Sequence, residues 1–319
     1  MKKLFLICVN ILLIFNFTSC REKAAAVQEA SPNSAKFTVL STIFPSYDWA
    51  KNLVAGSDSF AVDLLLKDGV DMHSYQPSAA DIVKISTADI FIYVGGESDA
   101  WISDALKNAT NKDMIVINLM EVLKGFVKQE EIIEGMQGED SSEEDEEEEF
   151  DEHVWLSLNN AIAASNQIAR SLMEKDESNS SIYMANLVSY MQKLISLKNE
   201  YSSAFGEKTI IVCDRFPFRY LADEFGIKYY AAFPGCSAET EASFDTIAFL
   251  AGKIDELEAN SVFVTESADK KIARTVVSSS HHTHSKIITL DSMQSTTLKQ
   301  AKKGADYIEI MRANLEALK

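Results

Sequence analysis

The sequence contains five histidines, whose side chains can bind a metal ion or transfer a proton. His73 lies in GVDMHSYQPS and His153 lies in DEHVWLS, and each has carboxylates beside it. A neutral imidazole is a common metal ligand, and a neighbouring carboxylate can orient it. Taken alone, each histidine could equally be a packed or hydrogen-bonded side chain. The pair is therefore a candidate metal site that needs support from the elements around it.

The motifs of common enzymes and nucleotide-binding proteins are absent after the first 20 residues. The sequence contains no CxxC pair, no HExxH, no GxSxG, no GxGxxG and no Walker loop. No set of nucleophile and general base is evident either. We therefore expect a binding protein rather than an enzyme.

Acidic residues dominate the charge of the chain. The formal net charge is −18, from 48 acidic and 30 basic residues, and the segment 139–152 alone holds 11 of the acidic ones. Such a chain is a poor partner for nucleic acid and a better one for cations. The segment can be interpreted as a low-affinity cation collector or as a solvated insert. The HHTH run of His281, His282 and His284 is likewise an exposed loop or an auxiliary metal site.

Alternating strand and helix patterns surround these residues and predict two α/β lobes with mostly parallel sheets. Four apolar, β-branched runs in each half read as buried strands, separated by helical stretches. The predicted strands are 36–44, 60–66, 88–95, 114–118, 208–213, 227–233, 261–266 and 286–290. We expect a first lobe over 36–170 that contains the acidic insert, a linking helix over 171–205, and a second lobe over 206–319. His73 and His153 then lie in loops that face a cleft between the lobes.

The N-terminal residues are expected to be a targeting sequence rather than part of the folded domain. Lys2 and Lys3 precede the apolar run LFLICVNILLIFNF, which is typical of a secretory signal peptide over 1–20. Small residues then lead into Cys20, as at a bacterial lipoprotein cleavage site, where the cysteine becomes lipidated. Residues 21–35 are polar and suit a flexible tether. The alternative is an ordinary signal peptide with an incidental cysteine.

The segments HSYQPSAADIVKISTADIFIYVGGESDAW, DEHVWLS and LDSMQS carry a resemblance to a known family. In their order and separation they resemble the metal-binding proteins of bacterial zinc and manganese ABC importers. The likeness covers essentially the whole chain after the tether. It implies two α/β lobes joined by a long helix, with the metal in the cleft between them. The ligands of that family are usually two histidines, a third histidine or glutamate, and an aspartate or glutamate.

The resemblance places the ligands on His73, His153 and Asp291, and leaves the remaining position open. Where the family has a His-Asp pair, this sequence has Cys213 and Asp214. A Cys213 thiolate would favour Zn²⁺ over Mn²⁺. Alternatively, Cys213 forms a disulfide with Cys236, and Asp214 or water completes the site, or Cys213 is simply a buried cysteine.

The function that follows is extracytoplasmic capture of a divalent transition metal, with Zn²⁺ expected and Mn²⁺ as the alternative. The expected partners are the membrane permease of an ABC importer and the membrane itself through the lipid anchor only, and the protein is expected to be monomeric. The competing hypotheses are a secreted zinc metalloenzyme, an organic-solute-binding lipoprotein, and a surface adhesin.

Overall fold

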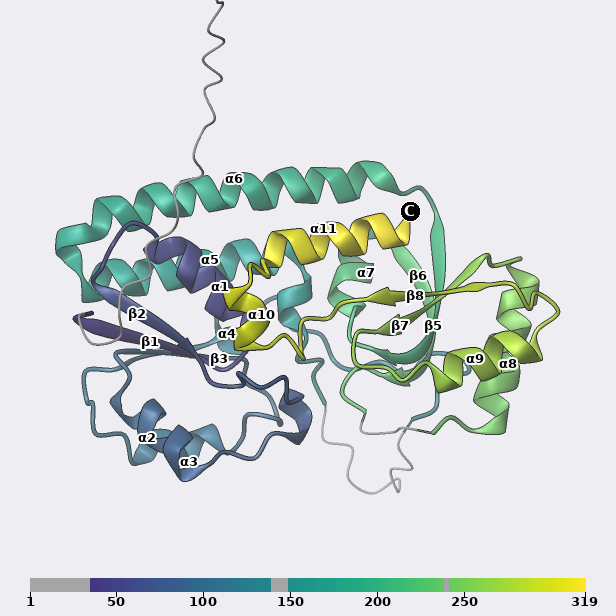
Figure 1. Ribbon diagram of the computed structural model, residues 1–319, viewed down its shortest axis with the longest axis horizontal. Helices are drawn as coiled ribbons and strands as arrows, with labels where there is room; N and C mark the ends of the chain where they lie inside the picture. The colour runs from purple at the N-terminus through teal and green to yellow at the C-terminus, as the bar shows by residue number, and fades with distance from the viewer. Residues whose placement is uncertain (1–34, 139–148, 238–240) are drawn as a thin grey trace, which may run out of the picture.

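The structure is a computed structural model that describes residues 35–138, 149–237 and 241–319. Figure 1 shows two α/β lobes side by side, with the helix α6 (Ser180–Ala204) extending from the first lobe to the second. The expected signal peptide, Cys20, nearly all of the expected tether and most of the acidic segment lie outside the described residues. In the part of the chain that is described, no helix is long and apolar enough to cross a membrane.

The first lobe is built on a parallel four-stranded sheet in the order β2-β1-β3-β4. Its strands are apolar and their central residues are buried, which is typical of a parallel sheet with helices on its faces. The helix after the first histidine begins with a capping box, in which Ser78 and Asp81 each accept a backbone N–H of the other. The elements are β1 (Phe37–Ser41), α1 (Phe44–Val54), β2 (Phe60–Leu64), α2 (Ala79–Thr87), β3 (Ile90–Tyr93), α3 (Ile102–Lys107), β4 (Ile115–Asn118) and α4 (Leu119–Val122).

The second lobe repeats this architecture with a parallel sheet in the order β6-β5-β7-β8. The pairing of β5 with β6 shifts register between Val212 and Arg215, so that β5 continues past the predicted end at residue 213 to Phe216. The elements are β5 (Lys208–Phe216), α7 (Arg219–Phe225), β6 (Ile227–Pro234), α8 (Phe244–Glu256), β7 (Ser261–Thr265), α9 (Lys271–Ser279) and β8 (Lys286–Leu290).

Helices connect the lobes at two places. A short 3-10 turn (Glu177–Asn179) separates the helices α5 (Leu158–Lys175) and α6 (Ser180–Ala204), and the 25 residues of α6 span about 38 Å. The C-terminal segment returns from β8 to the first lobe as α10 (Leu298–Lys302) and then runs along α6 as α11 (Tyr307–Leu318) (Figure 1). The sequence pattern predicts one helix over 296–318. The structure divides it at Gly304, whose φ of 101° is accessible to glycine at little cost.

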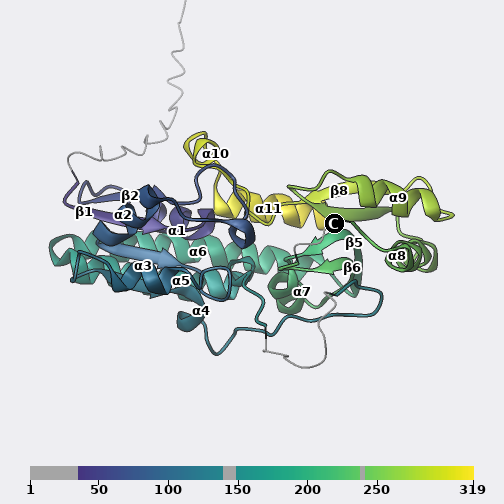
Figure 2. The same ribbon diagram turned by 90° about the horizontal axis from the view of Figure 1, so that it is seen from below.

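One apolar core runs through both lobes. It includes Val39 of β1, Leu194 of α6, Phe216 of β5 and Met311 of α11, and a smaller cluster fills the outer side of the second lobe. Buried hydrogen bonds join the same parts: the Trp155 indole N–H donates to the Ser292 carbonyl, and the Tyr307 hydroxyl donates to the Trp155 carbonyl. The view from below in Figure 2 shows α11 and α6 extending from one lobe to the other.

Candidate metal centre

The two predicted histidines come together although 80 residues separate them in the sequence. His73 lies in a short 3-10 turn (Met72–Ser74) in the loop that follows β2, and His153 immediately precedes a second 3-10 turn (Val154–Leu156). Their Nε2 atoms are 3.3 Å apart. Two nitrogens bound to one tetrahedral zinc ion at about 2.0–2.1 Å would be separated by about 3.4 Å. The spacing therefore fits a shared zinc ion.

Acidic and hydroxyl side chains orient both imidazole rings toward each other. The Nδ1 of His153 is 2.9 Å from Oδ1 of Asp151, which also accepts the backbone N–H of His153. The Nδ1 of His73 is 2.8 Å from the hydroxyl of Ser98 and 3.5 Å from Oε2 of Glu152. With a proton held on each Nδ1, both Nε2 lone pairs face the space between the rings.

Cys236 supplies a third donor. Among the described residues, one set of three His, Cys, Asp or Glu side chains has its donor atoms all within 4.8 Å of one another: His73, His153 and Cys236. Cys236 follows the carboxyl end of β6 and its backbone N–H donates to Glu130. Two imidazoles and a thiolate are a donor set typical of zinc.

Gln294, in the loop after β8, contacts both histidines. Its side-chain amide nitrogen is 3.0 Å from Nε2 of His73 and 2.6 Å from Nε2 of His153. An amide NH₂ group carries two protons, so it can donate one to each imidazole. Rotation of the same side chain by half a turn would present a carbonyl oxygen, which is a candidate fourth donor.

Burial favours the neutral form of both His73 and Cys236. Burial, followed by the neighbouring His153, lowers the pKa of His73 to about 3, which leaves the ring neutral and available as a ligand. Burial also raises the pKa of the Cys236 thiol, and the carboxylates of Glu130 and Asp151 add to this. A bound cation would reverse that effect, because it favours the thiolate.

The other residues expected from the family resemblance are not part of this donor set. Cys213 is 2% exposed and belongs to the apolar cluster of the second lobe. Asp214 accepts the backbone N–H and the hydroxyl of Thr265, and Asp291 accepts the backbone N–H of Met293. Burial and the nearby Glu266 raise the pKa of Asp291 to about 6.

The disulfide considered between Cys213 and Cys236 is not formed in the structure, where both are free thiols. The bulge in β5 places Cys213 away from the His73, His153 and Cys236 donor set. Because the strand continues to Phe216, Cys213 lies within it and Arg215 lies near its carboxyl end. There the Arg215 guanidinium pairs with Asp71 of the first lobe at 2.6 Å, which links the two lobes beside His73.

The remaining histidines lie elsewhere, in the connection between α9 and β8. The backbone N–H groups and Nδ1 atoms of His281 and His282 all contact the carboxylate of Asp255. These contacts with Asp255 account for the position of both rings, while His284 is exposed. The start of the acidic segment lies outside the described residues, whereas Asp151 and Glu152 at its end are buried beside the two rings.

Comparisons with known proteins identify the family and agree with the fold. Residues 39–319 match the family model described as zinc-uptake complex component A, periplasmic. The chain is 28% identical over its whole length to the zinc-binding protein AdcA of Streptococcus pyogenes serotype M3, of which it spans only 61%. It is 29% identical over 99% of its length to the high-affinity zinc uptake system protein ZnuA of Bacillus subtilis, covering 96% of that protein.

Solved structures show the same architecture. The Zn(II)-bound ZnuA-like domain of Streptococcus pneumoniae AdcA superposes with a TM-score of 0.69 at 27% identity, covering 89% of this chain and 98% of that domain. The metal-dependent lipoprotein YcdH of Bacillus subtilis gives a TM-score of 0.70 at 28% identity, with the same coverage. With a family model matched over nearly all of both lobes, the chain belongs to the family of the periplasmic component A of zinc-uptake complexes.

Proposed function

We propose that this protein captures Zn²⁺ outside the cytoplasmic membrane and delivers it to the permease of an ABC importer. The observation that carries the proposal is the convergence of the His73, His153 and Cys236 donor atoms within 4.8 Å, with the two Nε2 atoms 3.3 Å apart. The zinc-binding relatives AdcA and ZnuA support the choice of cargo. Zinc is then bound between the lobes, with donors contributed by both.

The donor set favours zinc over manganese. A thiolate is a soft ligand and Mn²⁺ prefers hard oxygen ligands, so Cys236 should discriminate against Mn²⁺. The amide oxygen of Gln294 completes a tetrahedral site after the side chain rotates. In this proposal Cys236 takes the place that the family resemblance suggested for Cys213, and Gln294 takes the place suggested for Asp291.

Gln294 also prepares the site for the metal. Its NH₂ group donates to both imidazoles at 3.0 and 2.6 Å, which holds the two lone pairs in the positions that zinc needs. Little reorganisation is then required beyond one amide rotation. The same contacts compete with zinc for the lone pairs, which assists release to the permease.

The anchor and the assembly state belong to the same proposal. We expect lipidation at Cys20 to hold the monomeric protein at the outer face of the membrane, close to the permease. The lipoprotein name of the Streptococcus pneumoniae relative supports this. A zinc metalloenzyme or an organic-solute-binding lipoprotein is less well supported, because the matched family is a component of a zinc-uptake complex.

The two described cysteines provide a matched test of the site. Both Cys213 and Cys236 are free, and only Cys236 has its sulfur beside the histidine pair. Cys236→Ala should weaken zinc binding by about tenfold to a hundredfold or more and abolish the sulfur-to-cobalt absorption band of the Co²⁺ form. Cys213→Ala should retain both properties. Competition with a chromophoric chelator measures the affinity.

The opposite pattern would identify Cys213 as the ligand, and wild-type zinc affinity in both variants would remove thiolate from the site. His73→Ala and His153→Ala complete the experiment, since each deletes one imidazole. Full affinity in these two variants would refute zinc capture at this place in the cleft.

A further inference from the structure

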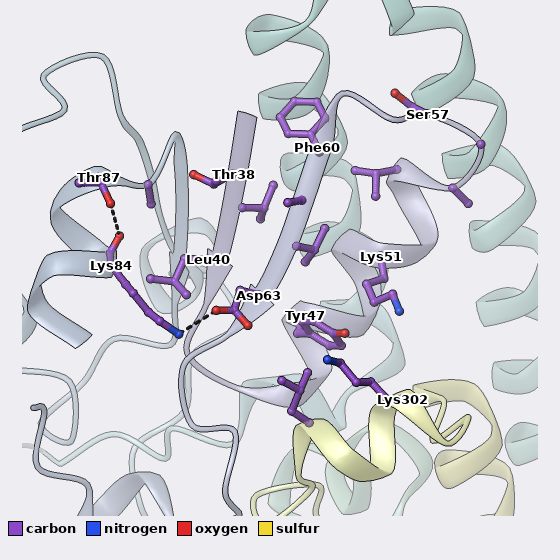
Figure 3. Close-up of a pocket in the computed structure, with 18 residues that line it drawn as sticks. Thr38, Leu40, Tyr47, Lys51, Ser57, Phe60, Asp63, Lys84, Thr87 and Lys302 are labelled. Atoms are coloured by element: carbon purple, nitrogen blue, oxygen red, sulfur yellow. Dashed lines mark hydrogen bonds and ion pairs between the residues drawn. The ribbon is translucent and has the colours of Figure 1, made fainter. Parts of the chain in front are cut away.

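A second cavity lies in the first lobe, away from the metal centre. Its volume is about 400 Å³, and none of the four proposed zinc donors lines it. Figure 3 shows it around the edge strand β2, with α1 on one side, α2 on the other and α10 near the start of α1. The cavity therefore joins the first lobe to the segment that returns from the second.

The walls of this cavity are largely apolar. Buried side chains of the strands and of α1 line it, among them Leu40, Val54 and Phe60, and Leu298 contributes from α10. Ligand pockets of proteins usually have volumes of about 300 to 1,000 Å³ and similar apolar walls with a few polar groups. An aliphatic chain of several carbons would fit the available volume and gain from leaving water.

Lysines outnumber carboxylates in the lining of the cavity. Three lysines line the cavity, Lys51, Lys84 and Lys302, against a single carboxylate, Asp63. Asp63 is already paired with Lys84 at 2.8 Å. The ammonium group of Lys302 has no hydrogen-bond or ion-pair partner among the described residues, and it extends from α10 toward Tyr47 (Figure 3).

Three lysines against one carboxylate give this lining more positive than negative side chains, in a chain whose formal net charge is −18. An unpaired ammonium beside an apolar cavity is the arrangement that recognises an anion with an aliphatic tail.

We propose that this cavity binds a free fatty acid of medium chain length. The tail lies against Leu40, Phe60 and Leu298, and the carboxylate pairs with Lys302. Because the ligand contacts both the first lobe and α10, it would hold the returning segment in place. This site is separate from the proposed zinc centre and does not depend on it.

Titration calorimetry with decanoate tests the proposal on residues 21–319, which retain every described element of both lobes. We expect one site, and an affinity that rises about fourfold for each added methylene from hexanoate to decanoate, as burial of about 0.8 kcal/mol per methylene predicts. Lys302→Glu should weaken decanoate binding by about tenfold or more. Lys299→Glu, on the same helix but outside the cavity lining, should bind like the wild type.

Zinc affinity of each variant, measured in parallel, reports whether the protein is folded. Equal decanoate binding by the two glutamate variants, or no dependence on chain length, would overturn the proposal. So would the absence of binding in a wild-type protein that binds zinc normally. Binding to vesicles of anionic phospholipid without binding to free decanoate would assign the lysines to a membrane surface instead.

Discussion

At the scale of single residues, Gln294 is unusual because its side-chain amide contacts both imidazoles of the candidate metal centre. A glutamine is neutral, so the proposed zinc site of two imidazoles, one thiolate and this amide would keep a net positive charge. A carboxylate at the same position would attract the cation more strongly but could not donate to both imidazoles. In this proposal the glutamine lowers the affinity for zinc, but it holds both imidazoles in position before zinc binds.

Substitution of Gln294 tests this interpretation. Gln294→Glu should raise zinc affinity by about tenfold, because an anionic oxygen replaces a neutral one. Gln294→Leu, which removes both the amide protons and the oxygen, should lower it by a similar factor. Chelator competition measures both variants. Unchanged affinity in the two would show that this side chain does not contact the metal.

Asp48 illustrates a buried carboxylate whose effect is on stability rather than on binding. It is 7% exposed, and burial, followed by repulsion from Asp306, raises its pKa to about 7. In the unfolded chain an aspartate titrates near 3.9. The folded state therefore binds this proton more tightly, and the free energy of unfolding falls as the pH rises from about 4 to 7.

Asp48→Asn should remove this part of the pH dependence. The wild type should lose stability between pH 4 and pH 7 by up to roughly 4 kcal/mol through this one group, and the variant should not. Urea unfolding across that range measures the difference. Asp104→Asn, at an exposed position, is the control and should leave the slope as it is. A slope in the Asp48 variant equal to that of the wild type would contradict the account.

At the scale of elements, the carboxyl ends of the parallel strands explain how the centre is assembled. His73 follows β2, Cys236 follows β6 and Gln294 follows β8, while the loop after β3 supplies Ser98. In α/β sheets these ends are where ligands collect. Strand prediction from the sequence therefore located the carboxyl ends of the strands, and the family resemblance placed the expected ligands on His73 and His153 beside their neighbouring carboxylates.

The sequence could not predict which other side chains reach that edge. Cys213 stands at the predicted end of a strand, but the bulge carries β5 on to Phe216 and leaves the cysteine in an apolar cluster. Cys236 stands three residues after the predicted end of a strand at residue 233, and this spacing could have suggested it. Gln294 offered no such clue, because an amide is an uncommon ligand, and Asp291 nearby was the more obvious choice.

The loop after β3 offers a test of how the rings are held. Gly96 has a φ of 82°, and a Cβ there would lie 2.3 Å from Oε1 of Glu152. Gly96→Ala should displace Glu152 from its contacts with Ser98 and His73 and reduce zinc affinity by about tenfold. Chelator competition on the folded variant gives the value.

Gly56→Ala is the matched control for backbone strain. Gly56 has a φ of 78°, and a Cβ added there would meet no atom within 4 Å, so its substitution costs stability through the backbone alone. It should bind zinc normally. Equal loss of affinity in both variants would mean that strain, and not the position of Glu152, weakens the site.

At the scale of the whole molecule, the acidic segment accounts for much of the net charge. Deletion of residues 139–148 should leave the single high-affinity zinc site intact, because the buried Asp151 and Glu152 remain. It should abolish weak binding of additional ions, and in the wild type salt should suppress that weak binding as well. Calorimetry at low and high ionic strength distinguishes the two classes. A loss of the tight site would show that the deleted residues supply a ligand.

The apolar core that continues from β1 through α6 to β5 and α11 bears on cooperativity. Two lobes with separate cores would melt as two units, whereas a shared core makes partial unfolding expose apolar surface on both sides at once. We expect a single transition in differential scanning calorimetry, with a calorimetric enthalpy equal to the van't Hoff enthalpy. Two resolved transitions would show that the lobes fold independently. A protein that unfolds in a single cooperative transition populates few partly unfolded states that a protease could cleave. Its resistance to proteolysis would therefore follow its global free energy of unfolding.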